Sequence, residues 1–381
     1  MTAARGRRGV RAMATVGLAC GVLLWTTASL ARAQTPAPPQ TPDEHHDQPT
    51  GPGPEMLVRA FGSVDWGATE PPANPNSFAL GQFDLFVTAS LNDRVSVLAE
   101  IVMEASSNDT RVVTDLERLQ LTFEVNDHLQ LTAGRYHTGI GFYNTAFHHG
   151  SYFETPIGRP RVFAFEDEGG VLPVHEIGLS ARGMVPKTGR ALHYLAEIGN
   201  GRTWTTEKGS DETAQKTQEP PDDQNESKST NVGLSLQPER WRGVEIGTSF
   251  YRDAIPIASA PDVNHRIAAA YAVYRTTTAE VMAEWLRLSY RTVDGRVSRS
   301  HGGYVQASKR WGNTRPYYRF DRLDVSPTTP FIGDRGSFQG HFIGLRVDPA
   351  MWIGLKAQYE RTDEAGLRGI DAVRTQLVFV F

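Results

Sequence analysis

Side chains that could bind or react with a small molecule gather in one segment, residues 134–173. His148 and His149 are adjacent, which is not the spacing that lets two ligands chelate a metal from one helical face, and no carboxylate partner stands at a suitable spacing. We therefore expect no metal and no cofactor. The remaining groups are suited to donate hydrogen bonds to anionic or polar solutes, while Glu154 either opposes them or lies on a solvated acidic surface. These donors are Arg135, His137, Arg159 and Arg161.

No pattern in the chain indicates catalysis. The sequence has no G-x-S-x-G nucleophile motif and no Walker or zincin motif. Glu280 and Glu284 lie on one predicted strand, so they do not form a carboxylate pair on a helix face. We expect a protein that is not an enzyme and that has no catalytic residues.

The same segment is too aromatic for a loop that lies free in solvent. Between residues 136 and 173 it carries several Phe and Tyr side chains, Phe142 among them. Exposed apolar patches of this size mark a surface that packs against something. We therefore expect this connection to fold back onto the rest of the protein.

Elsewhere the chain alternates apolar and polar residues with a period of two, which indicates strands with two different faces. The last segment shows it clearly, because Val373, Leu377, Phe379 and Phe381 alternate with Arg374 and Gln376. The run 278–290 changes phase near Leu286, which predicts either a bulge there or a misplaced strand boundary. About sixteen such strands are predicted from residue 55 onward, at 56–65, 78–91, 94–104, 115–125, 128–135, 174–186, 190–199, 229–237, 243–252, 264–275, 278–290, 301–310, 315–323, 337–347, 351–361 and 370–381.

The predicted connections alternate between long and short. Asn92-Asp93, Gly312-Asn313 and Asp348-Pro349 have turn chemistry and mark short ones, whereas 136–173, 200–228, 253–263 and 362–369 are among the long ones. Short turns on one rim and long loops on the other are typical of a sheet that spans an outer membrane. Unpaired backbone groups are costly in hydrocarbon, so such a sheet must close. The predicted fold is an all-β transmembrane antiparallel barrel over 55–381, with an inward-folded constriction loop.

The N-terminal region differs from the barrel segment in composition. Residues 1–33 combine a basic start, a short apolar stretch and a small-residue site ending at Ala33, as a cleaved secretory signal does. Residues 34–54 are rich in proline and polar residues and predict a disordered periplasmic tether. The only cysteine, Cys20, lies in the signal. After residue 33 the chain has 34 basic and 43 acidic residues, a net charge of −9, which argues against a nucleic-acid partner.

Strand phase places charged side chains inside the predicted barrel. Acids predominate on the early strands and arginines on the later ones. If these groups line opposite walls, they create a transverse field that orients dipolar solutes; the alternative is local pairing of scattered charges. The residues to which we assign this role are Arg118, Glu124, Arg182, Arg315, Arg319 and Arg374.

Two features resemble known families. The C-terminal strand that closes on Phe381 resembles the signature of bacterial outer-membrane β-barrels. Residues 134–141 and 144–150 resemble the region of phosphate-selective porin-like outer-membrane proteins in which a Gly-Arg-aromatic stretch leaves a strand and enters the constriction loop. Gly139 stands where that family often has Pro, and the chain has only six lysines. The resemblance therefore implies a porin barrel with a constriction loop, and it does not extend to phosphate selection.

Together these patterns predict an outer-membrane pore for passive diffusion of small hydrophilic solutes or ions, selected by size and charge at the 136–173 loop. Outer-membrane lipid would surround the barrel, and the resemblance to porins implies a possible homotrimer. The alternative is a non-conducting barrel that binds a ligand or anchors a surface structure, with the loop as a plug.

Overall fold

The computed structural model describes one of the two units into which the chain divides. The units are Met1–Gly51 and Pro52–Phe381. The described residues are 54–381 except 71–76, 106–111, 148–150, 166–168, 186–190, 205–216, 219–226, 258–259 and 365. The predicted signal segment and the predicted tether up to residue 53 therefore lie outside the described residues.

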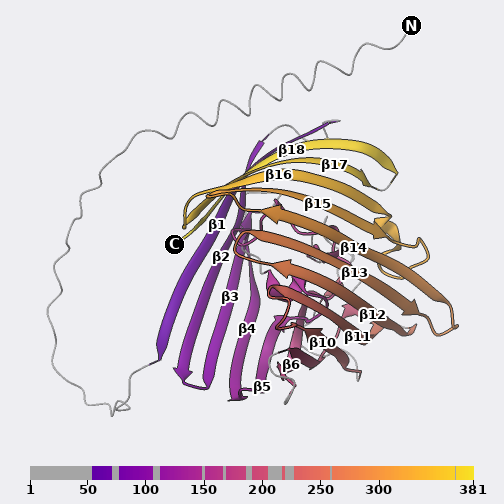
Figure 1. Ribbon diagram of the computed structural model, residues 1–381. Coiled ribbons are helices and arrows are strands. Elements are labelled where there is room, and N and C mark those ends of the chain that lie inside the picture. Colours follow the sequence, from indigo (N-terminus) through magenta and orange to yellow (C-terminus); the bar gives the residue numbers. More distant parts are fainter. Residues whose placement is uncertain are drawn as a thin grey trace, which may run out of the picture. The chain divides into compact units, whose positions relative to one another are not determined.

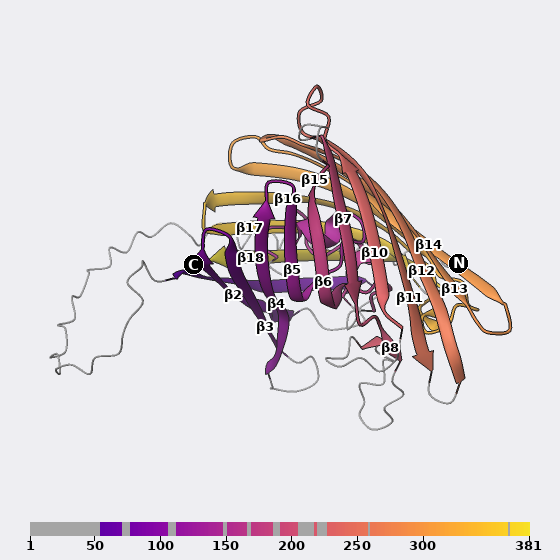
Figure 2. The ribbon, with the colours of Figure 1, turned by 90° about the horizontal axis from the view of Figure 1, so that it is seen from below.

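Sixteen antiparallel strands close into a barrel, which confirms the predicted fold class. Each strand pairs with the next along the wall, and β1 closes the ring against β18 with Phe61 opposite Val380. Figures 1 and 2 show the strands side by side around the wall. Their bounds are β1 Glu55–Glu70, β2 Ser77–Asn92, β3 Val95–Ala105, β4 Val112–Asn126, β5 Leu129–His137, β6 His175–Met184, β7 Leu192–Gly199, β10 Ser229–Leu236, β11 Val244–Ile257, β12 Ala260–Arg275, β13 Ala279–Arg291, β14 Val297–Lys309, β15 Thr314–Asp324, β16 Phe338–Ala350, β17 Ile353–Glu364 and β18 Leu367–Val380.

Short pieces of regular structure lie in the connections between these strands. They are α2 at Tyr143–Ala146, 3₁₀ turns at Arg161–Phe163 and Gly333–Arg335, and a two-stranded sheet of β8 (Thr203–Trp204) and β9 (Thr217–Gln218). In the part of the chain that the structure describes, no helix is long and apolar enough to span a membrane.

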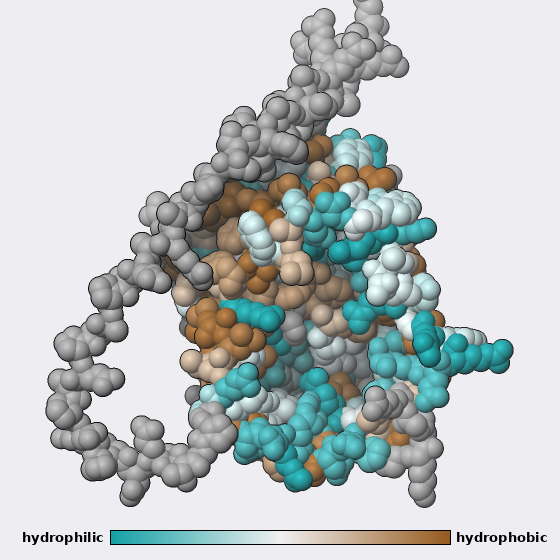
Figure 3. Space-filling view, turned by 60° about the vertical axis from the view of Figure 1, so that its left-hand side comes forward, coloured by the Kyte–Doolittle hydropathy of each residue, from teal (hydrophilic) through white to brown (hydrophobic). Residues whose placement is uncertain are grey.

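The two faces of the wall follow the alternation of the sequence. On β13, Val281 and Trp285 point outward and are 43% and 48% exposed, whereas Met282 and Leu286 point inward and are fully buried. Figure 3 shows apolar side chains gathered over much of one side of the barrel. A wall of this kind suits contact with lipid on its outer face.

The predicted bulge near Leu286 is wrong. The register of β13 with β12 and with β14 runs through this residue without a shift. The change of phase in the sequence arises because Leu286 and Leu288, although they point inward, are apolar. They contribute to an apolar cluster inside the barrel, so at this place the inner face of the wall is not the polar one.

Two connections predicted to be long are short. The predicted loop 253–263 is largely strand, because β11 ends at Ile257 and β12 begins at Ala260, and the predicted loop 362–369 reduces to the two residues between Glu364 and Leu367. Ladder hydrogen bonds need only extended backbone, so a hairpin can continue beyond the segment in which side chains alternate. The polar residues in these hairpins hid the strand ends from the sequence pattern.

Gly134 in β5 provides a test of the wall geometry. Its φ of +122° is rare for other residues, and an added Cβ would collide with the carbonyl oxygen of Leu119. We expect Gly134→Ala to destabilise the folded barrel by roughly 1–3 kcal/mol, measured as a lower urea midpoint in detergent. Gly295→Ala is the control, since Gly295 also has positive φ (+83°) but nothing within 4 Å. Equal midpoints for the two variants would contradict the collision.

Candidate pore constriction

The connection between β5 and β6 folds into the barrel. Residues 138–174 leave the wall after His137 and return at His175. Between these points the connection contacts inward-facing side chains of β7, β11, β13, β15, β16 and β17. We call these residues the inner loop.

Carboxylates of the wall accept hydrogen bonds from backbone N–H groups of the inner loop. Glu284 accepts from the N–H groups of Phe142 (2.6 Å) and Tyr143 (2.8 Å) and from the hydroxyl of Tyr304 (2.8 Å). Elsewhere Gly139 N–H donates to Glu197 at 2.9 Å, and Arg161 N–H donates to Asp321 at 3.1 Å. A loop inside the barrel has no ladder partners, so buried carboxylates satisfy its donors.

Basic and amide side chains of β15–β17 donate to loop carbonyls. Arg346 reaches the carbonyl oxygens of Tyr152 (2.6 Å) and Glu154 (2.8 Å), and Lys356 those of Ser151 (2.6 Å) and Pro156 (3.1 Å). Arg319 donates to the carbonyls of Gly158 (2.6 Å) and Arg159 (3.2 Å). Gln358 both accepts from the N–H of Ile157 and donates to its carbonyl, at 3.1 Å each.

An apolar cluster joins the inner loop to the wall of β11–β14. Tyr143 stacks on Phe163 with ring centroids 5.5 Å apart and meets Tyr304 edge-on at 5.6 Å. Burial, with the negative charge of nearby Glu154 as a second cause, raises the pKa of Tyr143 well above its ordinary value. The cluster consists mainly of Ile140, Phe142, Tyr143, Phe147, Val162, Phe163, Val171 and Leu172 of the loop against Tyr251, Ile255, Val263, Ile267, Val273, Met282, Leu286 and Leu288 of the wall.

Local sequence lets the loop approach the wall closely. Gly141 has φ +73°, and a Cβ there would collide with the Glu284 carboxylate. Asn144 ties the turn together, because its amide donates to the carbonyls of Thr138 (2.8 Å) and Val174 (3.0 Å). The entry and exit of the loop are therefore held side by side.

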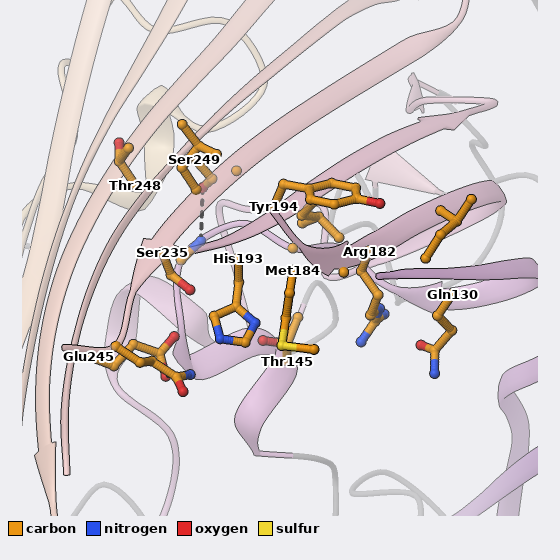
Figure 4. A pocket seen from close by; sticks show the side chains of 18 of the residues that line it. Gln130, Thr145, Arg182, Met184, His193, Tyr194, Ser235, Glu245, Thr248 and Ser249 are labelled. Carbon is orange, nitrogen blue, oxygen red and sulfur yellow. Dashed lines mark hydrogen bonds between the residues drawn. The ribbon is translucent and has the colours of Figure 1, made fainter. Parts of the chain in front are cut away.

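Two cavities border the inner loop. One, of about 470 Å³, lies between the loop and β4–β7 and β10–β12, with Arg182, His193, Ser235 and Glu245 in its lining. Figure 4 shows these side chains together with Thr145 of α2, and the hydrogen bond (3.1 Å) from the N–H of Gly141 to Ser249. The second, of about 310 Å³, lies between the loop and β18–β1–β2–β3, and its charged lining residues are Asp65, Glu104, Glu154, Arg159 and Arg374.

The predicted solute donors, two at the end of β5 and two in the inner loop, bind protein atoms. Arg135 donates to the carbonyl of Glu117 (3.0 Å), and His137, which is buried, is hydrogen-bonded through Nδ1 to the carbonyl of Asn144 (3.0 Å). Arg159 donates to the carbonyl of Phe163 (2.7 Å), and Arg161 pairs with Glu364 (2.5 Å). Their role toward solutes stays a prediction.

Of the four other residues predicted for the constriction, the structure places two, Phe142 and Glu154. Phe142 packs on Tyr271 with ring centroids 5.6 Å apart, and the Glu154 carboxylate accepts from the Tyr143 hydroxyl at 2.9 Å. His148 and His149 lie outside the described residues.

The predicted lumen charges do point inward but are mostly paired. Arg118 pairs with Glu100, and Arg374 with Glu360 at 2.9 Å. Arg315 donates to the Thr155 hydroxyl at 3.2 Å, and Arg319 pairs with Asp321 at 3.0 Å. Glu124 and Arg182 line the larger cavity.

Sequence patterns did not identify the residues that hold the loop. Glu284 was placed only on a predicted strand, and Lys356 and Arg346 were not singled out. Alternation places all three inside the barrel, and that was the available signal. Their partners, however, are backbone groups of the loop, and no side-chain pattern reveals a backbone partner.

Comparison with solved structures gives the class of the fold. OmpF of Salmonella typhi in complex with daunomycin has a TM-score of 0.61 at 12% identity, over 86% of this chain and 98% of that one. The anion-selective porin from Comamonas acidovorans has a TM-score of 0.60 at 10% identity, over 86% and 100%. The trimer form of OmpT from Vibrio cholerae, an outer-membrane protein, has 0.55 at 11%, over 87% and 100%.

These likenesses show a porin-type β-barrel fold. No protein-family model matches the chain, and no curated protein matches it. The more specific resemblance to phosphate-selective porins stays a prediction.

Glu284 should govern the docking of the loop. We expect Glu284→Ala to weaken docking by about 1–3 kcal/mol, because three buried donors lose their acceptor. Limited proteolysis of the purified barrel should then cut the inner loop faster. Glu280→Ala on the same strand is the control, since the carboxylate of Glu280 accepts from Gln306 (3.4 Å). Equal cleavage rates for Glu284→Ala and the wild type would contradict this role.

Proposed function

We propose that the protein is an outer-membrane porin that lets small hydrophilic solutes or ions diffuse passively through its barrel. The observation that carries the proposal is the inner loop, which crosses the lumen and leaves cavities of about 470 and 310 Å³ beside it, each with charged side chains in its lining. A sixteen-stranded barrel is too wide for wall side chains alone to fill. Water would fill the part of the lumen that the inner loop does not occupy.

Selection by size and charge would take place where the loop narrows the lumen. The smaller cavity is bordered by the acids Asp65, Glu104 and Glu154 and by Arg159 and Arg374, and the charge of Arg374 is countered by Glu360. Charged side chains at close quarters in a narrow passage discriminate between ions. Because the inner loop is docked at many points, its narrowing of the passage would be a fixed one.

The proposal includes export and assembly. Residues 1–33 would be removed as a signal, so that the mature protein begins at Gln34. The barrel would insert in the outer membrane, surrounded by lipid. A homotrimer is proposed because the similar Vibrio cholerae protein is described in a trimer form.

Conductance in a planar lipid bilayer tests the proposal. The purified barrel should produce stable, stepwise increases in current without any energy source. Heat-unfolded protein at the same concentration is the control. Inserted, folded barrels that produce no steps would contradict a pore.

Ion selectivity tests the assignment of the basic wall. We expect the double change Arg315→Ala and Arg319→Ala to shift permeability toward cations, because two positive charges leave the inner wall. The measurement is the reversal potential in a salt gradient, with Arg296→Ala, in an exposed turn, as the control. An unchanged anion-to-cation permeability ratio would rule out a selective role for these two residues. Limited proteolysis would report whether loss of the Arg319 contacts has also released the loop.

One observation favours the second candidate, a non-conducting barrel that binds a ligand or anchors a surface structure. The apolar cluster fills the side of the lumen next to β11–β14, so the inner loop acts there as part of a core. If the loop closes the remaining passage as well, the bilayer experiment will show inserted barrels without conductance.

A further inference from the structure

Arginines are concentrated on the outer face of β11–β14, toward the rim of the barrel at which the inner loop leaves β5; we call this rim the long-loop end. Arg252 on β11 lies directly opposite Arg266 on β12. Arg266 lies opposite Ser289 on β13, which in turn lies opposite Arg299 on β14. The row therefore crosses four neighbouring strands, which Figure 1 shows side by side.

Two more arginines widen this row. Arg287 and Arg291 stand two residues before and after Ser289 on the same face of β13. Their neighbours across the ladder are Ala268 and Asn264, respectively, so no carboxylate stands opposite either of them on β12. We call the five residues Arg252, Arg266, Arg287, Arg291 and Arg299 the arginine patch.

All five side chains of the patch are exposed. None forms a side-chain hydrogen bond or ion pair with any residue that the structure describes. Outward arginines further around the wall do have partners: Arg322 pairs with Asp324 at 2.7 Å, and Arg361 with Asp371 at 3.3 Å. The patch is thus a local excess of positive charge.

This excess is unfavourable for the barrel alone. Side chains directly opposite in an antiparallel pair have Cβ atoms about 4.5–5.5 Å apart, and like charges at such a pair destabilise the sheet. Arg252 and Arg266 form such a pair. An anion between the guanidinium groups would turn this repulsion into attraction.

The surroundings of the patch indicate which anion fits. Toward the short turns, the same outer face continues with Phe250, Ala270 and Trp285, which are exposed and apolar or aromatic. Tryptophan is enriched where hydrocarbon meets the polar head groups of a membrane. The arginines therefore stand at the height of head groups, with an apolar wall next to them for an acyl chain.

We propose that the arginine patch binds the phosphate group of an anionic lipid in the leaflet at the long-loop end. Guanidinium groups bind phosphate oxygens through two parallel hydrogen bonds, which gives this contact geometric specificity. The Ser289 hydroxyl, between Arg266 and Arg299, supplies a further donor. The small side chains of Ala268 and Ala270 leave room for an acyl chain against the wall. This inference rests on the proposed function, because it requires the barrel to lie in a membrane.

The experiment is a lipid titration of the purified barrel in neutral detergent, followed by native mass spectrometry. The probes are phosphatidic acid, diacylglycerol with the same chains but no phosphate, and inorganic phosphate alone. Wild-type protein should retain phosphatidic acid and not diacylglycerol. The double variant R252A/R266A should bind phosphatidic acid about 30-fold more weakly, since each arginine near a membrane surface contributes about 1 kcal/mol.

Two further variants make the result interpretable. R240A/R242A removes two exposed arginines at the short-turn end of the same region and should bind like the wild type. R287Q/R299Q tests the patch independently, should R252A/R266A fail to fold, and should also weaken binding. Wild-type affinity in both patch variants would overturn the inference. Equally tight binding of inorganic phosphate would show that the patch binds a free anion and not a lipid, and this result would also overturn the inference.

Bilayer conductance separates this inference from the proposed function. Patch variants should conduct like the wild type, because the patch lies outside the barrel. Conducting barrels that bind phosphatidic acid regardless of the patch would refute the lipid site alone. Folded barrels that fail to conduct in the wild type and in every variant would refute the proposed pore. The lipid titration would still decide, independently, whether the patch binds phosphatidic acid.

Discussion

The structure depends on one constraint: every backbone N–H and C=O group away from bulk water must find a partner. The wall meets it by closing, so that β1 and β18 become partners instead of two free edges. The inner loop cannot join a ladder and meets the same constraint through side chains. Carboxylates such as Glu284 and Asp321 take its N–H groups, and cations such as Arg346 and Lys356 take its carbonyls.

Because charged side chains of the wall bind the backbone of the inner loop, inward charges have to be interpreted differently. In a water-filled barrel an inward arginine is naturally assigned to solutes, as Arg319 was from the sequence. In the structure its guanidinium is buried among loop carbonyls and Asp321. Charges that line the passage and charges that fasten the loop alternate with outward residues in the same way, so strand phase alone cannot separate them. Only the course of the loop separates the two groups.

The two faces of β11–β14 also differ from the usual arrangement of a barrel wall. Inside, Ile267, Leu286 and Leu288 are apolar because the inner loop covers them. Outside, Arg252 and Arg266 carry charge on a face that is otherwise suited to lipid. Each departure from simple alternation thus marks a place where the wall contacts something other than water or hydrocarbon chains. On the inside this is the inner loop, and on the outside, by our proposal, it is a lipid head group.

The sequence by itself determined the strands of the barrel, because the alternation of apolar and polar residues with a period of two is visible in neighbouring residues. The predicted strands 229–237 and 278–290 lie within a residue of Ser229–Leu236 and Ala279–Arg291. Only the tertiary structure decided how the loop docks, since Phe142 meets Glu284 across 142 positions and Tyr152 meets Arg346 across 194. Such contacts form because the closed wall brings strands that are distant in the sequence around one lumen. The local pattern of residues does not indicate which strand faces which part of the loop.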